Sequence, residues 1–289
     1  MQSKNLTVLN LARPTPGDDQ FYPRWSVFGN VFDDIGSAQD CDILVADQRV
    51  EVTNELIKRY PSLKYVCSAT TGLTHIKFDS VPWIKVIHLT DRSFLRDIKS
   101  VAEFVFRLIL THARPLDGYG HTLNDKTIAI VGGLGRIGSH VAYIAKAFGM
   151  FNIVIDRSNP QGVRLLKEAD YVSIHIPETE ENNKWFDAKK IAMMKKSAYL
   201  INTSRGSVLD ERALVEAITE GRIAGAALDT VSDIESINQC IGYNLLVTNH
   251  IAGSTLEDRI KTDQHIVDKL KMLIDGVEPQ RLGSSQSQH

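Results

Sequence analysis

The chain has 289 residues, about twice the length of an average domain, so two domains are expected. Its 33 basic and 35 acidic side chains leave a net charge of −2, which removes the electrostatic case for a nucleic-acid partner. The longest apolar stretch, 104–110, contains Arg107 and is far shorter than the roughly 20 residues of a membrane span, so no membrane partner is expected.

The cysteines and histidines indicate no metal site. Cys41, Cys67 and Cys240 are odd in number and far apart, and the nine histidines do not pair at the spacing of known zinc motifs. We therefore expect neither a metal nor a disulfide framework. The first residues lack a charged segment followed by an apolar one, which favours a reducing, cytoplasmic location over secretion.

The first hundred residues alternate β-rich and helical runs. Strands are expected over 6–11, 42–46, 63–69 and 83–89, and a helix over 52–60 that ends at Pro61. This alternation predicts a parallel sheet. From 94 to 114, apolar residues recur every three or four positions, which predicts one long amphipathic helix ending before Pro115.

A second βα series follows without a flexible linker, and it has enough elements for a complete nucleotide-binding sheet. The expected strands are 127–131, 152–155, 171–176, 198–202, 224–228 and 245–248, and the expected helices are 139–148, 163–169 and 211–220. A last helix over 255–275 opens with a capping-box pattern, and the polar residues 283–289 are expected to be disordered.

A glycine-rich turn, GGLGRIG, follows the expected strand 127–131. Gly133, Gly135 and Gly138 form the GxGxxG pattern, which permits a tight turn, bare backbone against a pyrophosphate and close packing of the next helix. The amides at that helix's N-terminus would face the phosphates. The pattern predicts a dinucleotide site, although glycine turns also join strands to helices for structural reasons alone.

The residues after the next strand bear on the choice of cofactor. Asp156 stands where a carboxylate can bind the adenosine ribose and repel a 2′-phosphate, so we expect NAD and not NADP. Arg157 is the counter-argument, because a neighbouring arginine can bind that phosphate. The alternative is that Arg157 is simply solvated.

From Val101 to Ser254 the sequence resembles the D-isomer-specific 2-hydroxyacid dehydrogenases, a family that includes D-3-phosphoglycerate dehydrogenase and glyoxylate/hydroxypyruvate reductase. Several stretches match in the family's order. Besides the glycine turn they are VAE at 101–103, AFGM at 147–150, ADYVSIHIP at 169–177, INTSRG at 201–206, AGAALD at 224–229 and HIAGS at 250–254.

The resemblance implies an α/β fold with two Rossmann-like, doubly wound parallel-sheet domains, the nucleotide domain being inserted in a flavodoxin-like substrate domain. Residues 1–97 would form the first part of the substrate domain and 98–254 the NAD-binding Rossmann domain. Residues 255–289 would form a C-terminal helix returning to the substrate domain, plus the disordered tail. The resemblance also implies a homodimer.

The activity implied is that of an NAD-dependent oxidoreductase that reduces a small 2-oxo acid to a D-2-hydroxy acid and runs in reverse. Such a reaction needs an acid/base poised near neutral pH and a cation for the substrate carboxylate. His250, after an expected strand, suits the first role, and Arg205 suits the second. The backbone amides of Thr71, Gly72 and Leu73 resemble the family's loop that binds the same carboxylate.

The resemblance assigns the cofactor-binding positions as well. They are Gly133, Gly135, Arg136, Ile137, Gly138, Asp156, Arg157, His175, Pro177, Thr179, Thr203, Arg205, Asp229, His250 and Gly253.

One catalytic position departs from the family pattern. The family places a glutamate after its Ala-Leu-Asp stretch to pair with the histidine, and Ile234 stands there. Asp233 and Glu235 flank it, and a one-residue slip would bring Glu235, the longer side chain, to His250. We therefore take Glu235 as the third catalytic residue. If neither carboxylate reaches His250, activity should be weak or shifted to lower pH.

Two further departures concern the cofactor. Gly132 is an extra residue in the glycine turn, and the segment between Asp156 and Asp170 is too short for the family's helix plus strand. They predict a trimmed adenosine side of the pocket and a lower affinity for NAD. The missing glutamate at Ile234 leaves open an alternative, a catalytically weak or inactive NAD(H)-binding regulatory protein of the same fold. A Rossmann-like oxidoreductase acting on an uncharged alcohol is a third reading, against which Arg205 argues.

Overall fold

The computed structural model describes residues 5–12, 22–116, 118–240 and 242–276. The expected disordered tail, 283–289, lies outside the described residues. The chain divides into two compact units: a first unit made of Met1–Asp97 and Thr255–His289, and a second unit, Ile98–Ser254. Within the described ranges, no helix is long and apolar enough to cross a membrane.

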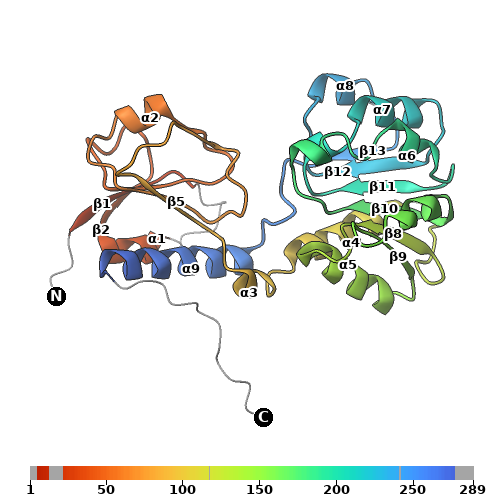
Figure 1. Ribbon diagram of the computed structural model, residues 1–289, viewed down its shortest axis with the longest axis horizontal. Coiled ribbons are helices and arrows are strands. Elements are labelled where there is room, and N and C mark those ends of the chain that lie inside the picture. The colour runs from red at the N-terminus through yellow and green to blue at the C-terminus, as the bar shows by residue number, and fades with distance from the viewer. Residues whose placement is uncertain (1–4, 13–21, 117, 241, 277–289) are drawn as a thin grey trace, which may run out of the picture. The chain divides into compact units, whose positions relative to one another are not determined.

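The first unit contains a five-stranded parallel sheet in the order β2-β1-β3-β5-β7. Helices α1 and α9 lie on one face of the sheet and α2 on the other (Figure 1). The strands are β1 (Leu6–Asn10), β2 (Gly29–Phe32), β3 (Ile43–Val45), β5 (Tyr65–Ser68) and β7 (Lys85–His88), and the helices are α1 (Tyr22–Trp25), α2 (Asn54–Lys58), α3 (Arg92–Leu95) and α9 (Leu256–Ile274).

A small two-stranded sheet of β4 (Val52–Thr53) and β6 (Ile76–Lys77) adjoins α2. The helix expected over 52–60 therefore begins two residues late. Val52 pairs with Ile76, and the Thr53 hydroxyl accepts a hydrogen bond from the Leu56 N–H and caps α2. The strand β2, in which all but Asn30 are half-buried, was not expected from the sequence.

The single long helix expected over 94–114 is wrong. The structure has two helices, α3 and α4 (Ser100–Ala113), separated by residues 96–99. The break falls at the boundary between the units, where Asp97 ends the first and Ile98 opens the second. The apolar period continues across the break because each helix buries its own stripe, α3 through Leu95 and α4 through a longer row of residues.

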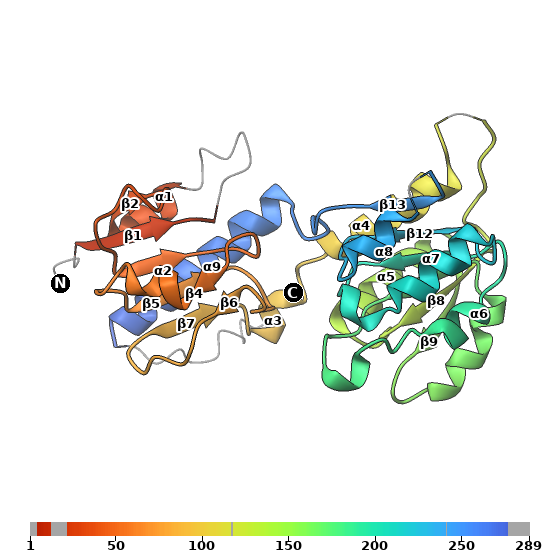
Figure 2. The same ribbon diagram turned by 90° about the horizontal axis from the view of Figure 1, so that it is seen from above.

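The second unit contains a six-stranded parallel sheet in the order β13-β12-β11-β10-β8-β9. Helices α4 and α5 cover one face, and α6, α7 and α8 cover the other (Figures 1 and 2). The strands are β8 (Thr127–Val131), β9 (Phe151–Ile155), β10 (Tyr171–Ile174), β11 (Tyr199–Asn202), β12 (Gly225–Leu228) and β13 (Leu245–Val247), and the further helices are α5 (Arg136–Ala147), α6 (Ala188–Ala192), α7 (Glu211–Thr219) and α8 (Ile234–Asn238).

The inner strands of this sheet are buried along their whole length, as expected for parallel strands covered on both faces. Their side chains alternate between two apolar cores. Leu200 and Leu228 belong to the core under α7, and Ile201 and Ala227 belong to the core under α4 and α5. Because all six strands run parallel, their carboxyl ends meet at one edge, where ligands bind in open α/β sheets.

The segment after β9 differs from the helix expected over 163–169. It forms a 3₁₀ helix, η2 (Pro160–Glu168), and returns at once to β10, so that β9 is the edge strand. Counted along the chain, the strand order is 2-1-3-4-5-6 and not the 3-2-1-4-5-6 of many dinucleotide-binding domains. The short segment that the sequence shows after Asp156 is thus the reason why one outer strand is missing.

Candidate functional site

The glycine turn connects β8 to α5 at the carboxyl edge of the second sheet. Gly132 has a φ of 77°, in the left-handed region, and a β-carbon there would lie 2.5 Å from the carbonyl oxygen of His175. At Gly138 a β-carbon would lie 2.3 Å from the carbonyl oxygen of Gly132. Only glycine at these positions lets the turn and the helix approach this closely.

The N-terminus of α5 is bare backbone. Gly135 is its N-cap, and no side chain caps the helix there. The first N–H groups of a helix, here including those of Ile137 and Gly138, have no partner within the helix, and they carry its positive dipole end. A β-carbon at Gly133 would lie 2.9 Å from Val154, so the turn also packs tightly on β9. This arrangement suits a pyrophosphate, and it needs no metal.

His175, which follows β10, packs under the turn. Its backbone N–H bonds to the carbonyl of Val131 at 2.8 Å, and its Nε2 lies 2.7 Å from the hydroxyl of Ser173. Burial lowers the pKa of His175 to about 3, so the ring is neutral at physiological pH. Its buried Nδ1 has no hydrogen-bond partner among the described residues. The residue whose backbone packs against the turn is therefore uncharged, and one polar atom of its side chain is unused.

The expected adenosine end lies at the edge strand. Asp156 follows β9 and is half-buried. Arg157 is exposed and pairs with the equally exposed Glu181, at 3.1 Å between Nη2 and Oε2. The guanidinium that could bind a 2′-phosphate is thus paired with a carboxylate.

The loop after β10 is fixed by its own side chains. Thr179 caps the short 3₁₀ helix η3 (Glu180–Asn182) by accepting a hydrogen bond from the Asn182 N–H at 3.2 Å. The buried Asn182 donates in turn to the carbonyl of Pro177 at 2.8 Å. Pro177 and Thr179, both expected to contact the cofactor, therefore belong to a braced loop.

A buried asparagine shapes the loop that carries Arg205. Asn202 ends β11, and its Oδ1 accepts hydrogen bonds from the N–H and the hydroxyl of Ser204 at 3.0 and 2.7 Å. Its Nδ2 donates to the carbonyl of Arg205 at 2.8 Å. Arg205 is half-buried and uses one guanidinium N–H for the carbonyl of Ser204. The hydroxyl of Thr203 beside it is buried and has no partner within the described residues.

Asp229, directly after β12, holds the loop that carries His250. Its side chain is buried, and it accepts hydrogen bonds from the Thr248 hydroxyl at 2.6 Å, the Ile251 N–H at 2.8 Å and the Ala252 N–H at 2.9 Å. Its carbonyl accepts the His250 N–H at 2.8 Å. These four bonds explain how His250 keeps a φ of 53°, which is costly for a residue with a β-carbon.

The surroundings of His250 favour its neutral form. Burial lowers its pKa first, and the positive charge of Arg205 lowers it further, while the carboxylate of Asp229 opposes both. Arg205 and His250, expected to act together, are therefore close enough for their charges to interact. Gly253, in the same loop, is exposed.

The position of the expected third residue is set by helix α8. Glu235 lies in the first turn of α8 and lines an exposed hollow against α7 with Arg212, Val215 and Glu216. The charged groups that shift the pKa of His250 are Arg205 and Asp229.

Asp233 is committed elsewhere too. It caps α8 through Ser236 and pairs with Arg212, and the Ser236 hydrogen bonds lead the effects that lower its pKa to about 2. The helix α8 is the physical reason for both placements, because it begins directly after Asp233 and turns Glu235 toward α7. This helix was not expected from the sequence.

The amides expected to bind a substrate carboxylate lie in the first unit. Thr71, Gly72 and Leu73 form a turn after β5, with Thr71 exposed and the other two half-buried. This turn belongs to the first compact unit, whereas Arg205 and His250 belong to the second.

Sequence reasoning missed Asn202 and the bracing roles of Asp229 and Thr248. Asn202 and Asp229 stand at the ends of apolar, buried strands, and Thr248 follows the partly exposed edge strand β13. Parallel strands deliver such side chains to the ligand-binding edge. That position was the available signal. Which polar residue faces the ligand and which holds the loop depends on tertiary contacts that spacing alone does not contain.

The second unit is a dinucleotide-binding domain by its fold, its bare glycine turn and its helix N-terminus. The family model described as "D-isomer specific 2-hydroxyacid dehydrogenase, NAD binding domain" matches residues 93–252. The protein belongs to this family of NAD-dependent dehydrogenases. The expected family, fold class and cofactor are thereby confirmed.

Relatives and solved structures agree with this membership. The chain is 30% identical over 286 residues to a glyoxylate reductase of Aeropyrum pernix, covering 86% of this chain and 84% of that protein. It is 31% identical to a hydroxypyruvate reductase of Thermotoga maritima, covering 80% and 84%. A solved acyclic imino acid reductase in complex with NADPH and D-Arg is 26% identical, covers 95% and 99% of the two chains, and has a TM-score of 0.73.

Proposed function

We propose that the protein is an NAD-dependent dehydrogenase that reduces a small 2-oxo acid to the D-2-hydroxy acid and catalyses the reverse reaction. The observation that carries this proposal is the loop held by Asp229, which presents a half-buried His250 within electrostatic reach of Arg205. An acid/base and a cation for a carboxylate are the two groups that this reaction requires of the chain.

In reduction, bound NADH supplies the hydride. The imidazolium of His250 gives a proton to the substrate's carbonyl oxygen, and the guanidinium of Arg205 binds the carboxylate and polarises the carbonyl. The amides of Thr71, Gly72 and Leu73 bind the same carboxylate. Asp229 keeps His250 oriented and favours its charged form, a role that a separate glutamate would otherwise fill.

We further propose that the second unit binds NAD in preference to NADP. Asp156 would bind the adenosine ribose, and the pair of Arg157 with Glu181 leaves no unpaired positive charge there for a 2′-phosphate. The remaining assigned positions, from Gly133 to Gly253, would line the cofactor along the carboxyl edge of the sheet. The first unit, Met1–Asp97 with Thr255–His289, would be the substrate domain.

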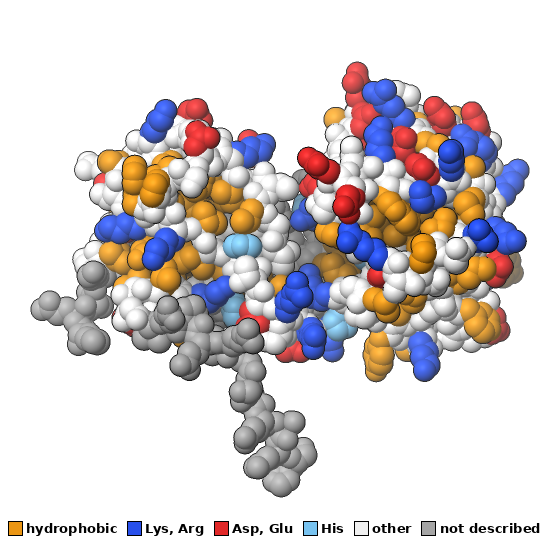
Figure 3. Space-filling view, viewed as in Figure 1, with side chains coloured by type: hydrophobic (Ala, Val, Ile, Leu, Met, Phe, Trp, Pro, Cys, Tyr) orange, Lys and Arg blue, Asp and Glu red, His pale blue; other side chains and the backbone are white. Residues whose placement is uncertain are grey.

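A homodimer in the cytoplasm is part of the same proposal. The second unit exposes large apolar side chains, among them Leu116, Tyr119, Tyr143 and Phe151. Figure 3 shows hydrophobic side chains reaching the surface of this unit between the charged ones. A second copy would remove such apolar surface from water.

The test is NADH consumption with a panel of 2-oxo acids that runs from glyoxylate and pyruvate to phosphohydroxypyruvate. Turnover on one acid, reduced about 10²- to 10⁴-fold in His250→Gln while NADH still binds, would support the proposal. Glu235→Gln tests the third residue, whose role remains a prediction: activity close to that of the unmodified chain would remove Glu235 from the mechanism. NADH binding without turnover on any acid would favour the non-catalytic binding protein.

A further inference from the structure

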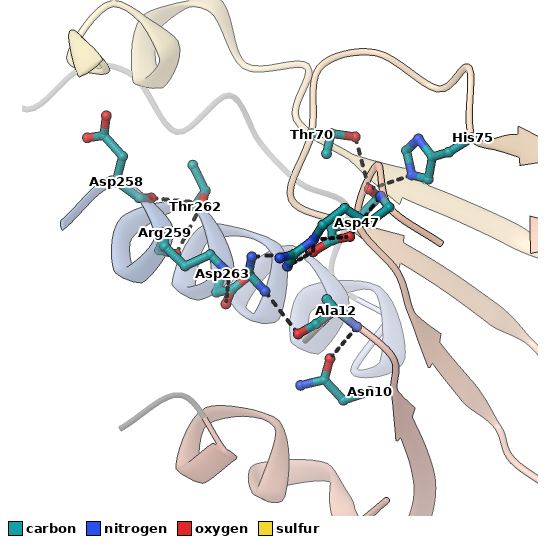
Figure 4. Close-up of polar contacts among 11 residues, drawn as sticks. Asn10, Ala12, Asp47, Thr70, His75, Asp258, Arg259, Thr262 and Asp263 are labelled. Carbon is teal, nitrogen blue, oxygen red and sulfur yellow. Dashed lines mark hydrogen bonds and ion pairs between the residues drawn. The ribbon is translucent and has the colours of Figure 1, made fainter. Parts of the chain in front are cut away.

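A chain of buried polar side chains lies behind the turn 71–73 in the first unit. His75 is 4% exposed and Ser68 is fully buried, and the Ser68 hydroxyl lies 3.0 Å from Nε2 of His75 and 2.9 Å from the Thr70 hydroxyl. The Thr70 hydroxyl donates to the carbonyl of Gly72 at 2.8 Å. Figure 4 shows Thr70 and His75 directed toward the same point, with dashed lines from both.

Two carbonyl groups of the turn, those of Gly72 and Leu73, and that of Thr70 before it accept hydrogen bonds within the first unit. Besides the bond to Gly72, the carbonyl of Thr70 accepts the Leu89 N–H at 3.1 Å, and that of Leu73 accepts the Ile76 N–H at 2.9 Å. Within the part of the chain that the structure describes, no acceptor faces the N–H groups of Thr71, Gly72 or Leu73. The Gly72 and Leu73 carbonyls are therefore used within the first unit, and the N–H groups of the turn remain available to a ligand.

The bond from Thr70 fixes where one of these donors points. In a planar trans peptide the C=O of one residue and the N–H of the next point in opposite directions. Because the Gly72 carbonyl is held toward Thr70, the Leu73 N–H must point away from it. Successive N–H groups that point outward from a turn form an anion-binding concavity.

We infer that His75 is a positioning residue, which acts through Ser68 and Thr70 to hold the Gly72–Leu73 peptide with its N–H directed at the carboxylate of the substrate. This inference rests on the proposed function and deepens it, because it names what sets affinity for the acid group in the first unit. His75 itself touches no substrate. Burial lowers the pKa of His75, and Asp47 partly opposes this, so the imidazole is neutral. Its Nε2 forms a hydrogen bond with the Ser68 hydroxyl.

A purely structural role for His75 predicts different behaviour. Loss of a core side chain lowers stability and affects kcat, KM and cofactor binding together. Loss of a positioning contact weakens the binding of the acid alone, because NADH binds to the second unit.

The experiment compares four variants of the full chain. Thr70→Val and His75→Leu remove links of the chain, His75→Gln keeps a polar atom near the position of Nε2, and Thr74→Val changes the exposed neighbour in the same turn. We expect KM for the preferred 2-oxo acid to rise about tenfold in the first two, the equivalent of one hydrogen bond, with kcat and the Kd of NADH within about twofold. The last two variants should retain the KM of the unmodified chain.

Equal effects on KM and on the Kd of NADH, or a KM in Thr70→Val that matches Thr74→Val, would overturn the inference. Amide hydrogen exchange keeps this result separate from the proposed function. The Ile76 and Leu89 N–H groups bond to the turn's carbonyls, so they should exchange faster in Thr70→Val and His75→Leu even if no 2-oxo acid is turned over. Unchanged exchange at both amides would show that the polar chain does not hold the turn.

Discussion

The two units have the same strand order, but they place different groups at the point where that order reverses. Counted along the chain, both parallel sheets run 2-1-3-4-5, with a sixth strand in the second unit. In each sheet the order reverses beside the first strand, between β1 and β3 or between β8 and β10. A crevice forms at the carboxyl ends of such a pair, and ligands of open α/β sheets bind there.

In the second unit this point is bare backbone, the turn of Gly132 to Gly138 and the start of α5. In the first unit it holds charged side chains. Arg259 of α9 donates to the carbonyl of Ala12, after β1, and lies 3.5 Å from Asp47, after β3 (Figure 4). Asp263, one helical turn further along α9, lies 3.5 Å from the same guanidinium.

The difference shows that topology offers a crevice but the residues at the strand ends decide its use. Glycine leaves space and exposed N–H groups, which suit a phosphate. An arginine between two carboxylates fills the space and ties α9 to the sheet. The first unit thus fills its crevice with charged side chains, and we expect the second to keep its own open for the cofactor.

Gly138→Val should produce the largest effect, because it forces apart the glycine turn and the helix α5 that would bind the phosphates. A β-carbon there would lie 2.3 Å from the Gly132 carbonyl oxygen, so α5 would have to move away from the turn. We expect NADH binding to be lost, as measured by NADH fluorescence titration. Gly36→Ala, whose nearest contact would be an ordinary 3.5 Å to Asp34, is the control. Intact NADH binding in Gly138→Val would show that the turn is not the phosphate site.

Arg259→Met tests the filled crevice. It removes one cation beside Asp47 and Asp263, while Asp47 keeps its pair with Arg49 and Arg24 still acts on Asp263. The loss in the free energy of unfolding should therefore lie between the about 1 kcal/mol of an exposed pair and the about 3–5 kcal/mol of a buried one. Urea unfolding measures this loss. NADH binding to the second unit should persist under native conditions.

Lys77→Met is the matched control in the same unit, because Lys77 pairs with Glu51 where both side chains are more than half exposed. Such a pair contributes at most about 1 kcal/mol. If both variants lost the same stability, the charges around Arg259 would not be what holds α9 to the sheet. Adding Asp263→Asn to Arg259→Met should recover part of the loss, since burial already raises the pKa of Asp263 and Arg259 opposes that rise.

The contrast between the units also shows what the sequence could reveal. The glycine turn and the short segment after Asp156 are visible because backbone space and chain length are local properties. Arg259 and Asp47 are far apart in the chain, and nothing in their spacing predicts that they meet. The break between α3 and α4 was missed because the apolar period continues across it, and the position of Glu235 beside α7 was not foreseen because the pattern did not reveal the helix that Asp233 starts.

The pH dependence of reduction tests the electrostatics of the open site. Burial and Arg205 disfavour the imidazolium of His250, so its pKa lies below the ordinary value of 6.5. Reduction needs the protonated ring. As the pH rises above the pKa of His250, kcat/KM should therefore fall about tenfold per pH unit, and this fall should begin at a pH below 6.5. Asp229→Asn removes the opposing charge and should move the fall to lower pH. A fall that begins above pH 6.5 would mean that another carboxylate, such as Glu235, acts on His250.

Glu181→Gln should produce the smallest effect, at the rim of the open site. It removes the partner of Arg157, and because both side chains are about four-fifths exposed the pair contributes at most about 1 kcal/mol, or about fivefold in affinity. The Kd of NADPH should therefore fall by no more than about fivefold, while that of NADH is unchanged and Glu180→Gln alters neither. A larger gain would show that Glu181, and not Asp156, sets the preference for NAD, because Asp156 remains in place to repel the 2′-phosphate. The size of the change thus decides whether Asp156, after β9, or Glu181, in the loop after β10, sets the preference for NAD.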